Sequence, residues 1–168
     1  MSPIQPSWIL RDLKFEIGDC TREWIFKSDS IDYIHNQWLS ESISNWNALF
    51  HQAFHDCKPS GWVENYETSS IITSDDNTVK EDSTLGQWGK IFIEGGERIR
   101  SIFTILEDGI QRKEMKEAGF VDIEEFDSKC PTGGWAKDPV LKEMGQRTQF
   151  RLERDTEGLV LFMAHTLG

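Results

Sequence analysis

Two histidines on one predicted helix have the spacing that zinc sites use. His51 and His55 stand four residues apart, so both side chains would lie on one face of a helix. In zinc hydrolases with this spacing a glutamate follows the first histidine and acts as general base, and Gln52 takes that place here. The histidines also point away from the apolar face of the helix, and no third ligand is evident. We therefore expect a solvated helix surface that binds no metal.

Three other polar residues follow or close predicted strands. Asp19 and Cys20 come just after the alternating segment 13–17, and His35 closes the segment 31–35. Ligands of α/β proteins bind at the carboxyl ends of parallel strands. A carboxylate there could accept a hydrogen bond from a ligand, and a histidine there could act as a base. The alternatives are a turn aspartate and a hydrogen-bonded structural histidine.

The elements that position these residues form a strand, a crossover helix and a second strand. The pattern predicts strands at 31–35 and 62–67, a helix at 46–57 and a tight turn at 58–61. Apolar side chains recur on one face of the helix at Trp46, Leu49, Phe50, Ala53 and Cys57. Ser44 or Asn45 can cap this helix, and Pro59 ends it. A unit of this size builds parallel sheets, so we predict an α/β protein.

The remaining segments complete one predicted domain, 1–168, with about four strands and helices on the faces of the sheet. Further strands are expected at 13–17 and 120–126, and helices at 83–106, 111–118, from Asp138-Pro139 and from Thr156. The long helix should break near Gly95-Gly96, and Gly119 should cap the next one. Leu141 and Met144 are expected to point inward.

Composition excludes several classes of protein. The net charge of -11 repels phosphate, so we expect binding neither to nucleic acid nor to an anionic membrane. Three widely spaced cysteines provide no disulfide framework and fit a reducing compartment, either cytoplasm or nucleus. We expect no signal peptide and no membrane span. Seven tryptophans and ten phenylalanines argue for a folded chain.

Several short segments together resemble one family. In order they are Ser2-Pro3-Ile4-Gln5-Pro6, 13–20, 31–35, Lys58-Pro59-Ser60-Gly61-Trp62-Val63-Glu64, Leu85-Gly86-Gln87-Trp88, 117–122 and Lys137-Asp138-Pro139. Their order and spacing resemble fungal class I S-adenosylmethionine-dependent methyltransferases, in particular the LaeA-like group. The resemblance runs over essentially the whole chain. It implies a Rossmann-like methyltransferase fold that is shortened here, with no Gly-rich cofactor loop or ribose-binding acid before residue 2 and no last strand.

The resemblance also implies roles for particular residues. Asp19 and Cys20 match the turn that contacts the adenine of S-adenosylmethionine, and His35 matches the strand end beside its methionine moiety. Trp38, Trp46 and Trp88 become candidates for the substrate pocket or the core. Because the Gly-rich loop and the ribose acid are missing, we expect weak binding of this cofactor and leave the catalytic residue unassigned.

These features leave three functions open. The first is a methyltransferase homologue that acts on a small fungal metabolite. The second is a non-catalytic regulatory or interaction protein with a protein partner, and the third is a metabolite-binding enzyme that reuses the acceptor pocket without methylating. Loss of the family's central strand would leave the 31–35 edge open, so we also expect the chain to form a homo-oligomer through that edge, to need a partner or to aggregate. The rival arrangement places 13–17 beside 31–35 and covers it.

Overall fold

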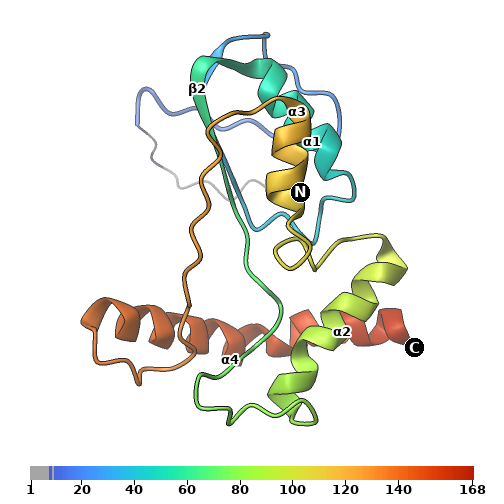
Figure 1. Ribbon diagram of the computed structural model, residues 1–168, viewed down its shortest axis with the longest axis vertical. Coiled ribbons are helices and arrows are strands. Elements are labelled where there is room, and N and C mark those ends of the chain that lie inside the picture. The colour runs from blue at the N-terminus through green and yellow to red at the C-terminus, as the bar shows by residue number, and fades with distance from the viewer. Residues whose placement is uncertain (1–7, 9) are drawn as a thin grey trace.

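The computed structural model describes Trp8 and residues 10–168, so the Ser2–Pro6 segment lies outside the described residues. The described residues form β1 (Ile31–Gln37), α1 (Trp46–Asp56), β2 (Cys57–Tyr66), α2 (Thr84–Ile99), α3 (Ile110–Ala118) and α4 (Pro139–Leu167), as Figure 1 shows. This is a mixed α/β structure, as the sequence predicts. No helix in the described part of the chain is both long and apolar enough to cross a membrane.

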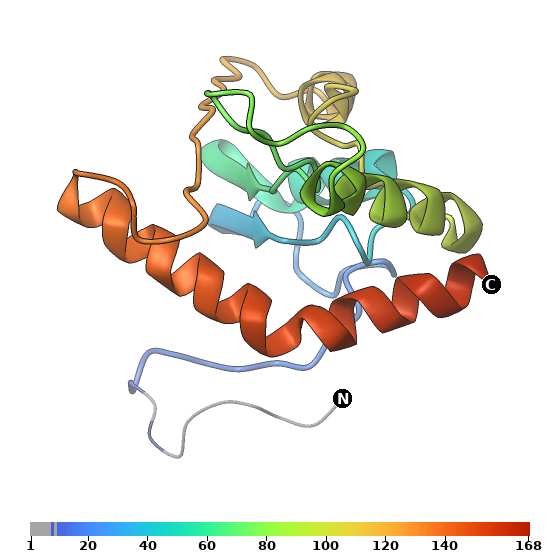
Figure 2. The same ribbon diagram turned by 90° about the horizontal axis from the view of Figure 1, so that it is seen from below.

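A parallel pair of strands, β1 and β2, is the sheet found among the described residues. Helix α1 is the crossover between them, so the predicted strand–helix–strand unit is confirmed. Helices α1 and α3 pack on each other beside the strands, while α2 and α4 cross one another at the other end of the molecule (Figures 1 and 2). The prediction of about four strands is wrong for the described residues, which form two.

The alternating segment 13–17 forms no strand. Its apolar side chains do not form a buried face: Leu13, Phe15 and Ile17 are 45%, 48% and 75% exposed. Alternation favours a strand only where one face is buried and the backbone has a partner. The rival arrangement, in which 13–17 lies beside β1 as a strand, is therefore not found.

The segment 120–126 forms no strand either. Asp122 has a left-handed backbone with φ 53°, which interrupts an extended run. Phe120 packs edge-to-face on Phe54 of α1, with ring centroids 5.1 Å apart. Val121 and Phe126 are 80% and 89% exposed. The Phe120 ring on α1, Ile123 on the core cluster and the Arg112–Glu125 ion pair therefore hold the segment as a loop.

Helix α1 follows its prediction closely. The Asn45 side chain accepts a hydrogen bond from the Ala48 amide, 3.0 Å away, and so caps the helix. The expected apolar face is buried, with Phe50 and Ala53 fully covered. The helix ends at Asp56, and β2 begins at the next residue rather than at Trp62.

The predicted turn at 58–61 lies inside β2 as a bulge. Ile31 pairs with Cys57 and Tyr33 with Trp62, so two steps along β1 match five along β2. The extra residues are held in part by Lys58, whose Nζ atom lies 2.8 Å from each carboxylate oxygen of Asp32.

Helix α2 runs without a break through Gly95 and Gly96 and ends at Ile99, so the break near these glycines and the extension to 106 are wrong. Arg100, with φ 61°, ends the helix in a left-handed conformation. The two glycines instead allow close packing, Gly95 against Met163 of α4 and Gly96 against Phe103.

Helices α3 and α4 begin and end near the expected signals. Gly119, with φ 111°, caps α3, and the Asp138 carboxylate accepts from the amides of Val140 and Leu141 at the start of α4. Helix α4 continues to Leu167, so the predicted final helix from Thr156 is its second half. Leu141 and Met144 are 40% and 37% exposed, so the prediction that they point inward is wrong.

Candidate functional site

The carboxyl ends of β1 and β2 are joined by a buried carboxylate. Glu67 is 8% exposed and accepts hydrogen bonds from the amides of Leu39, at 2.9 and 3.1 Å, and Ser40, at 3.2 Å. These bonds fix the loop that follows β1 against the end of β2. From the sequence, Glu67 is predicted only as the end of the strand 62–67. An acid directly after an alternating strand was the available signal.

A buried amide donor lies in the same part of the sheet. Asn36 of β1 is in register with Asn65 of β2, and Gln111 of α3 donates to Asn65 Oδ1 at 2.7 Å. Asn36 Nδ2 is buried and has no hydrogen-bond partner among the described residues. An unpaired buried donor costs about 1–3 kcal/mol. Asn36 Nδ2 can therefore donate a hydrogen bond to an oxygen atom of a ligand or a water molecule at this end of the sheet.

His35 lies on the exposed face of the sheet in a small hydrogen-bonded cluster. Its Nδ1 atom lies 2.7 Å from Glu64 Oε2, and the Tyr33 hydroxyl donates to the same oxygen at 2.5 Å. The hydrogen bonds from Tyr33 and then from His35 lower the pKa of Glu64, and the bond to Glu64 raises the pKa of Tyr33. Glu64 thus orients the His35 ring, which suits either a base or a structural histidine.

The Asp19 carboxylate makes its hydrogen bonds and its ion pair within its own turn. Its Oδ1 atom accepts from the Thr21 amide at 3.0 Å and from the Thr21 hydroxyl at 2.6 Å, and its Oδ2 atom lies 3.3 Å from Arg22 Nε. The hydrogen bonds from Thr21 are the main reason that the pKa of Asp19 is lowered. The carboxylate is exposed and satisfied locally, as a turn aspartate is.

Cys20 lies beside the start of α1. It packs against the core cluster that contains Trp46 and Leu49, and it lines a hollow of about 90 Å³. The other lining residues are Thr21, Ile43, Ser44, Asn45, Ala48, Leu49 and Gln52. Asn45 in this hollow is already used as the helix cap, so few polar groups remain free there.

The three candidate tryptophans lie in three different places. Trp38 follows β1 and is 49% exposed, with the Arg151 guanidinium of α4 4.3 Å from its ring centroid. Trp46 is 2% exposed and belongs to the core beside Phe50. Trp88 packs on Phe92 of α2, in a separate cluster. They do not line one pocket.

The residues expected at the cofactor do not meet either. Ile34 packs on Ala53 and Cys57, so its side chain faces α1. His35, the next residue of the strand, therefore projects from the opposite face. Cys20 packs on the α1 side. The sheet lies between Cys20 and His35.

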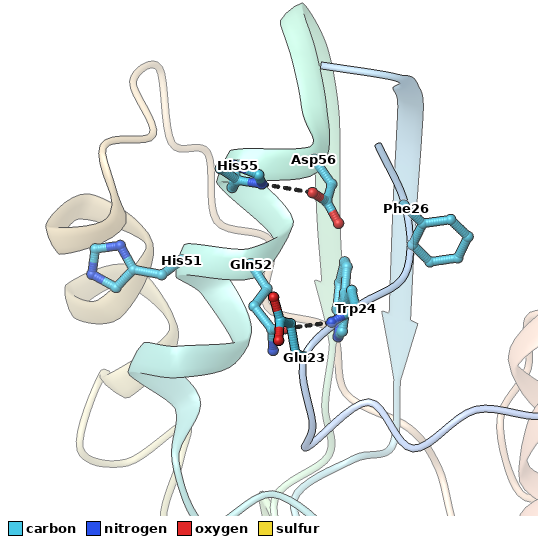
Figure 3. A pocket seen from close by; sticks show the side chains of 7 residues that line it. All are labelled: Glu23, Trp24, Phe26, His51, Gln52, His55 and Asp56. Carbon is cyan, nitrogen blue, oxygen red and sulfur yellow. Dashed lines mark hydrogen bonds and ion pairs between the residues drawn. The ribbon is translucent and has the colours of Figure 1, made fainter. Parts of the chain in front are cut away.

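A larger hollow, of about 320 Å³, lies between α1 and the segment that precedes β1 (Figure 3). Its lining residues are Glu23, Trp24, Phe26, His51, Gln52, His55 and Asp56. His55 Nδ1 lies 2.7 Å from Asp56 Oδ1, and the Trp24 amide donates to Gln52 Oε1 at 2.8 Å. Gln52 therefore has a structural role in holding the segment before β1.

His51 and His55 are both exposed, as their helical phase predicts. No group of three or more histidine, cysteine or acidic side chains with metal-binding geometry occurs in the described residues. The absence of zinc stays a prediction. Elemental analysis of the protein purified without a histidine tag should find no stoichiometric metal. One zinc ion per chain that is lost in His55→Ala would contradict it.

Known proteins are similar in sequence to this chain over nearly its whole length. It is 32% identical over 164 residues to the methyltransferase pytC of Aspergillus terreus, which covers 98% of this chain and 49% of that protein. It is 30% identical over 156 residues to the probable methyltransferase tdiE of Emericella nidulans, covering 91% of this chain and 47% of that protein. It is 31% identical over 158 residues to the secondary metabolism regulator LAE1 of Cochliobolus heterostrophus, covering 93% of this chain and 50% of that protein.

The chain is thus methyltransferase-like and is related to fungal methyltransferases and to LaeA regulators of secondary metabolism, which confirms the resemblance expected from its motifs. It spans about half the length of the curated relatives that it matches. No protein-family model matches the chain, and no solved structure matches it.

Proposed function

We propose that this chain forms part of a class I methyltransferase-like fold and that, by itself, it has a regulatory or interaction role rather than methyl-transfer activity. The relatives include both methyltransferases and regulators, so homology alone leaves the two roles open. The observation that favours the second role is the separation of the residues matched to the cofactor site: the sheet lies between Cys20 and His35.

The residues present do not fit S-adenosylmethionine, the cofactor that the family implies. Asp19 is satisfied by Thr21 and Arg22, and His35 is paired with Glu64 on the exposed face of the sheet. Asn36 Nδ2 is a free buried donor, but a single donor does not make a binding site for a nucleoside. Methyl transfer depends on holding donor and acceptor in line, so a chain that does not hold the donor supplies little of that positioning.

The partners that this role implies are a protein or a small metabolite. Methyl transfer remains the second candidate, in the case that another polypeptide segment completes the donor site. A cytoplasmic or nuclear location belongs to the same proposal. It is supported by Cys20, Cys57 and Cys130, which are free thiols in the structure.

Ligand-linked stability tests the proposal. A ligand at one hundred times its Kd stabilises the folded state by about 2.7 kcal/mol, which raises the Tm of a chain of this size by several degrees. We expect no such rise when S-adenosylmethionine is added at about 1 mM. A clear rise that disappears in Asp19→Ala would overturn the proposal and restore the enzymatic role.

A further inference from the structure

The hollow between α1 and the segment before β1 contains a buried carboxylate (Figure 3). Asp56, the last residue of α1, lines this hollow and is 3% exposed. Its Oδ1 atom pairs with His55 Nδ1 at 2.7 Å, and its Oδ2 atom accepts no hydrogen bond in the part of the chain that the structure describes. A carboxylate has about four lone-pair sites, so most of the acceptor capacity of Asp56 stays free. A buried charge of this kind favours a positively charged partner.

The walls beside this carboxylate are aromatic and are held in place. Trp24 and Phe26 lie edge-to-face, with ring centroids 6.2 Å apart. The Trp24 amide donates to Gln52 Oε1 at 2.8 Å, and the Trp24 indole Nε1 donates to the Cys20 carbonyl oxygen at 3.1 Å. The face of an aromatic ring attracts a cation within about 6 Å of its centroid. Because the ring is fixed before a ligand arrives, little freedom is lost on binding.

The charges around the hollow also favour a cation. Glu23 adds a second carboxylate to the lining, and Asp56 lies at the C-terminus of α1, where the helix dipole is negative. The lining includes neither lysine nor arginine, and its two histidines, His51 and His55, are both exposed. The net charge of the chain, -11, attracts cations and repels anions.

We propose that this hollow binds an alkylammonium group. The ammonium donates hydrogen bonds to Asp56 Oδ2 and to the Glu23 carboxylate, and the Trp24 ring forms a cation–π wall. The volume of about 320 Å³ is near the lower end for ligand pockets, so it suits a small group. The group belongs either to a small free amine or to the side chain of a lysine, since both present the same chemistry.

This site is separate from the residues matched to the methyl donor. Asp19, Cys20 and His35 are not among the residues that line the hollow. All seven lining residues lie between positions 23 and 56, on α1 and the segment before β1, so one short stretch of the chain builds the site. The proposal therefore goes beyond the proposed function and stands whether or not the chain binds S-adenosylmethionine.

An NMR titration of the full chain with butylammonium chloride tests the proposal. The backbone amide signals of residues 51–56 report on the hollow, and potassium chloride at equal ionic strength controls for screening. We expect saturable binding with a Kd on the order of 1 mM, which a ligand of five non-hydrogen atoms can reach. Butanol has the same size and no charge, so we expect it to bind at least roughly tenfold more weakly.

Charge variants test the two carboxylates. Asp56→Asn keeps the shape of the side chain and removes its charge, so we expect the Kd for butylammonium to rise roughly tenfold. Glu23→Gln should raise it only about threefold, because Glu23 is exposed to solvent. Asp127→Asn is the matched control: it changes the net charge equally, but Asp127 is exposed and does not line the hollow. Its Kd should equal that of the parent chain. Circular dichroism controls for folding.

A pair of variants at Trp24 tests the aromatic wall without changing either carboxylate. Both variants keep the backbone amide that donates to Gln52. Trp24→Leu removes the aromatic face and Trp24→Phe keeps one, so we expect the Kd of the leucine variant to be about threefold higher. Together with Glu23→Gln, this pair decides the question if Asp56→Asn does not fold.

The same titration with N-acetyl-lysine methylamide identifies the source of the ammonium group. Tighter binding of this compound than of butylammonium would indicate a lysine of a polypeptide, and weaker binding would indicate a free amine. Both results agree with the proposal. No saturable binding of either compound up to about 50 mM, equal affinity for butylammonium and butanol, or an unchanged Kd in both Glu23→Gln and Trp24→Leu would each overturn it.

Discussion

Phe50→Ala should lower the free energy of unfolding by about 3–5 kcal/mol, the usual cost of removing a fully buried phenylalanine. Phe50 is 0% exposed, and its ring centroid lies 5.8 Å from that of Trp46. It belongs to the cluster in which α1 meets α3 and the segment around Ile105. Ile43 and Ile105 of neighbouring loops are buried in the same cluster, so removal of the ring leaves a cavity between two helices and these loops.

Phe54 on the same helix is the matched control. It is 46% exposed and contacts Phe120 edge-to-face. We expect Phe54→Ala to cost only about 1 kcal/mol, the value of an aromatic pair at a partly exposed site. Urea denaturation of both variants measures the difference. Equal losses for the two variants would show that α1 does not bury the face described above.

Two alanine variants in α2, Gly96→Ala and Gly95→Ala, should change the free energy of unfolding in opposite directions. A Cβ atom at Gly96 would overlap Phe103 Cδ2 and lie 2.7 Å from the Ser101 carbonyl oxygen, and the backbone there cannot move away easily. Overpacking costs about 1–3 kcal/mol, so we expect Gly96→Ala to destabilise the chain by up to about 2 kcal/mol net of the helix-propensity gain. This steric cost exceeds the roughly 1 kcal/mol by which alanine favours a helix over glycine.

Gly95→Ala gains the same helix propensity with a softer contact. Its Cβ atom would lie 2.7 Å from Met163 Sδ, at the flexible end of a side chain that can turn aside. We expect this variant to be neutral or more stable by up to about 1 kcal/mol. Thermal denaturation of both variants checks the prediction. A Gly96→Ala protein as stable as Gly95→Ala would contradict the close packing of α2 on the 101–103 segment.

The sequence predicts helices well where apolar spacing and caps agree. Trp46, Leu49 and Phe50 share one face of α1, and Asn45 caps it, so local and tertiary preferences coincide. The same holds for Gly119 at the end of α3 and Asp138 at the start of α4. These signals act within a few residues, and tertiary contacts do not overrule them.

Strands were predicted less well, because a strand needs a partner that its own residues do not specify. The 13–17 segment has the right alternation but no surface to pack on. In 120–126 the left-handed Asp122 and the contact of Phe120 with Phe54 decide the conformation. The sequence predicts a break at Gly95 and Gly96, although their role depends on Met163, which is distant in sequence, and on Phe103, which lies beyond the helix end.

The arrangement of the candidate site also depends on contacts that local sequence pattern does not predict. The prediction that Asp19 and Cys20 follow a strand is wrong, because 13–17 forms no strand. His35 does not close its strand either, since β1 continues to Gln37. Local pattern also does not show that successive strand residues face opposite sides of the sheet toward different neighbours. The role of Glu67 depends on the amides of Leu39 and Ser40, which lie on a loop 27 or 28 residues earlier. Contacts of this range follow from the fold and not from local pattern.

Calorimetric titration of the pure chain with S-adenosylmethionine tests most directly whether the separated residues form a donor site. Because Asp19 is satisfied by its own turn and the sheet lies between Cys20 and His35, we predict a Kd weaker than about 1 mM, equivalent to less than about 4.1 kcal/mol of binding free energy. Asp19→Ala should give the same result as the parent chain. A micromolar Kd that is lost in Asp19→Ala would contradict the account and establish this chain as a donor-binding methyltransferase module.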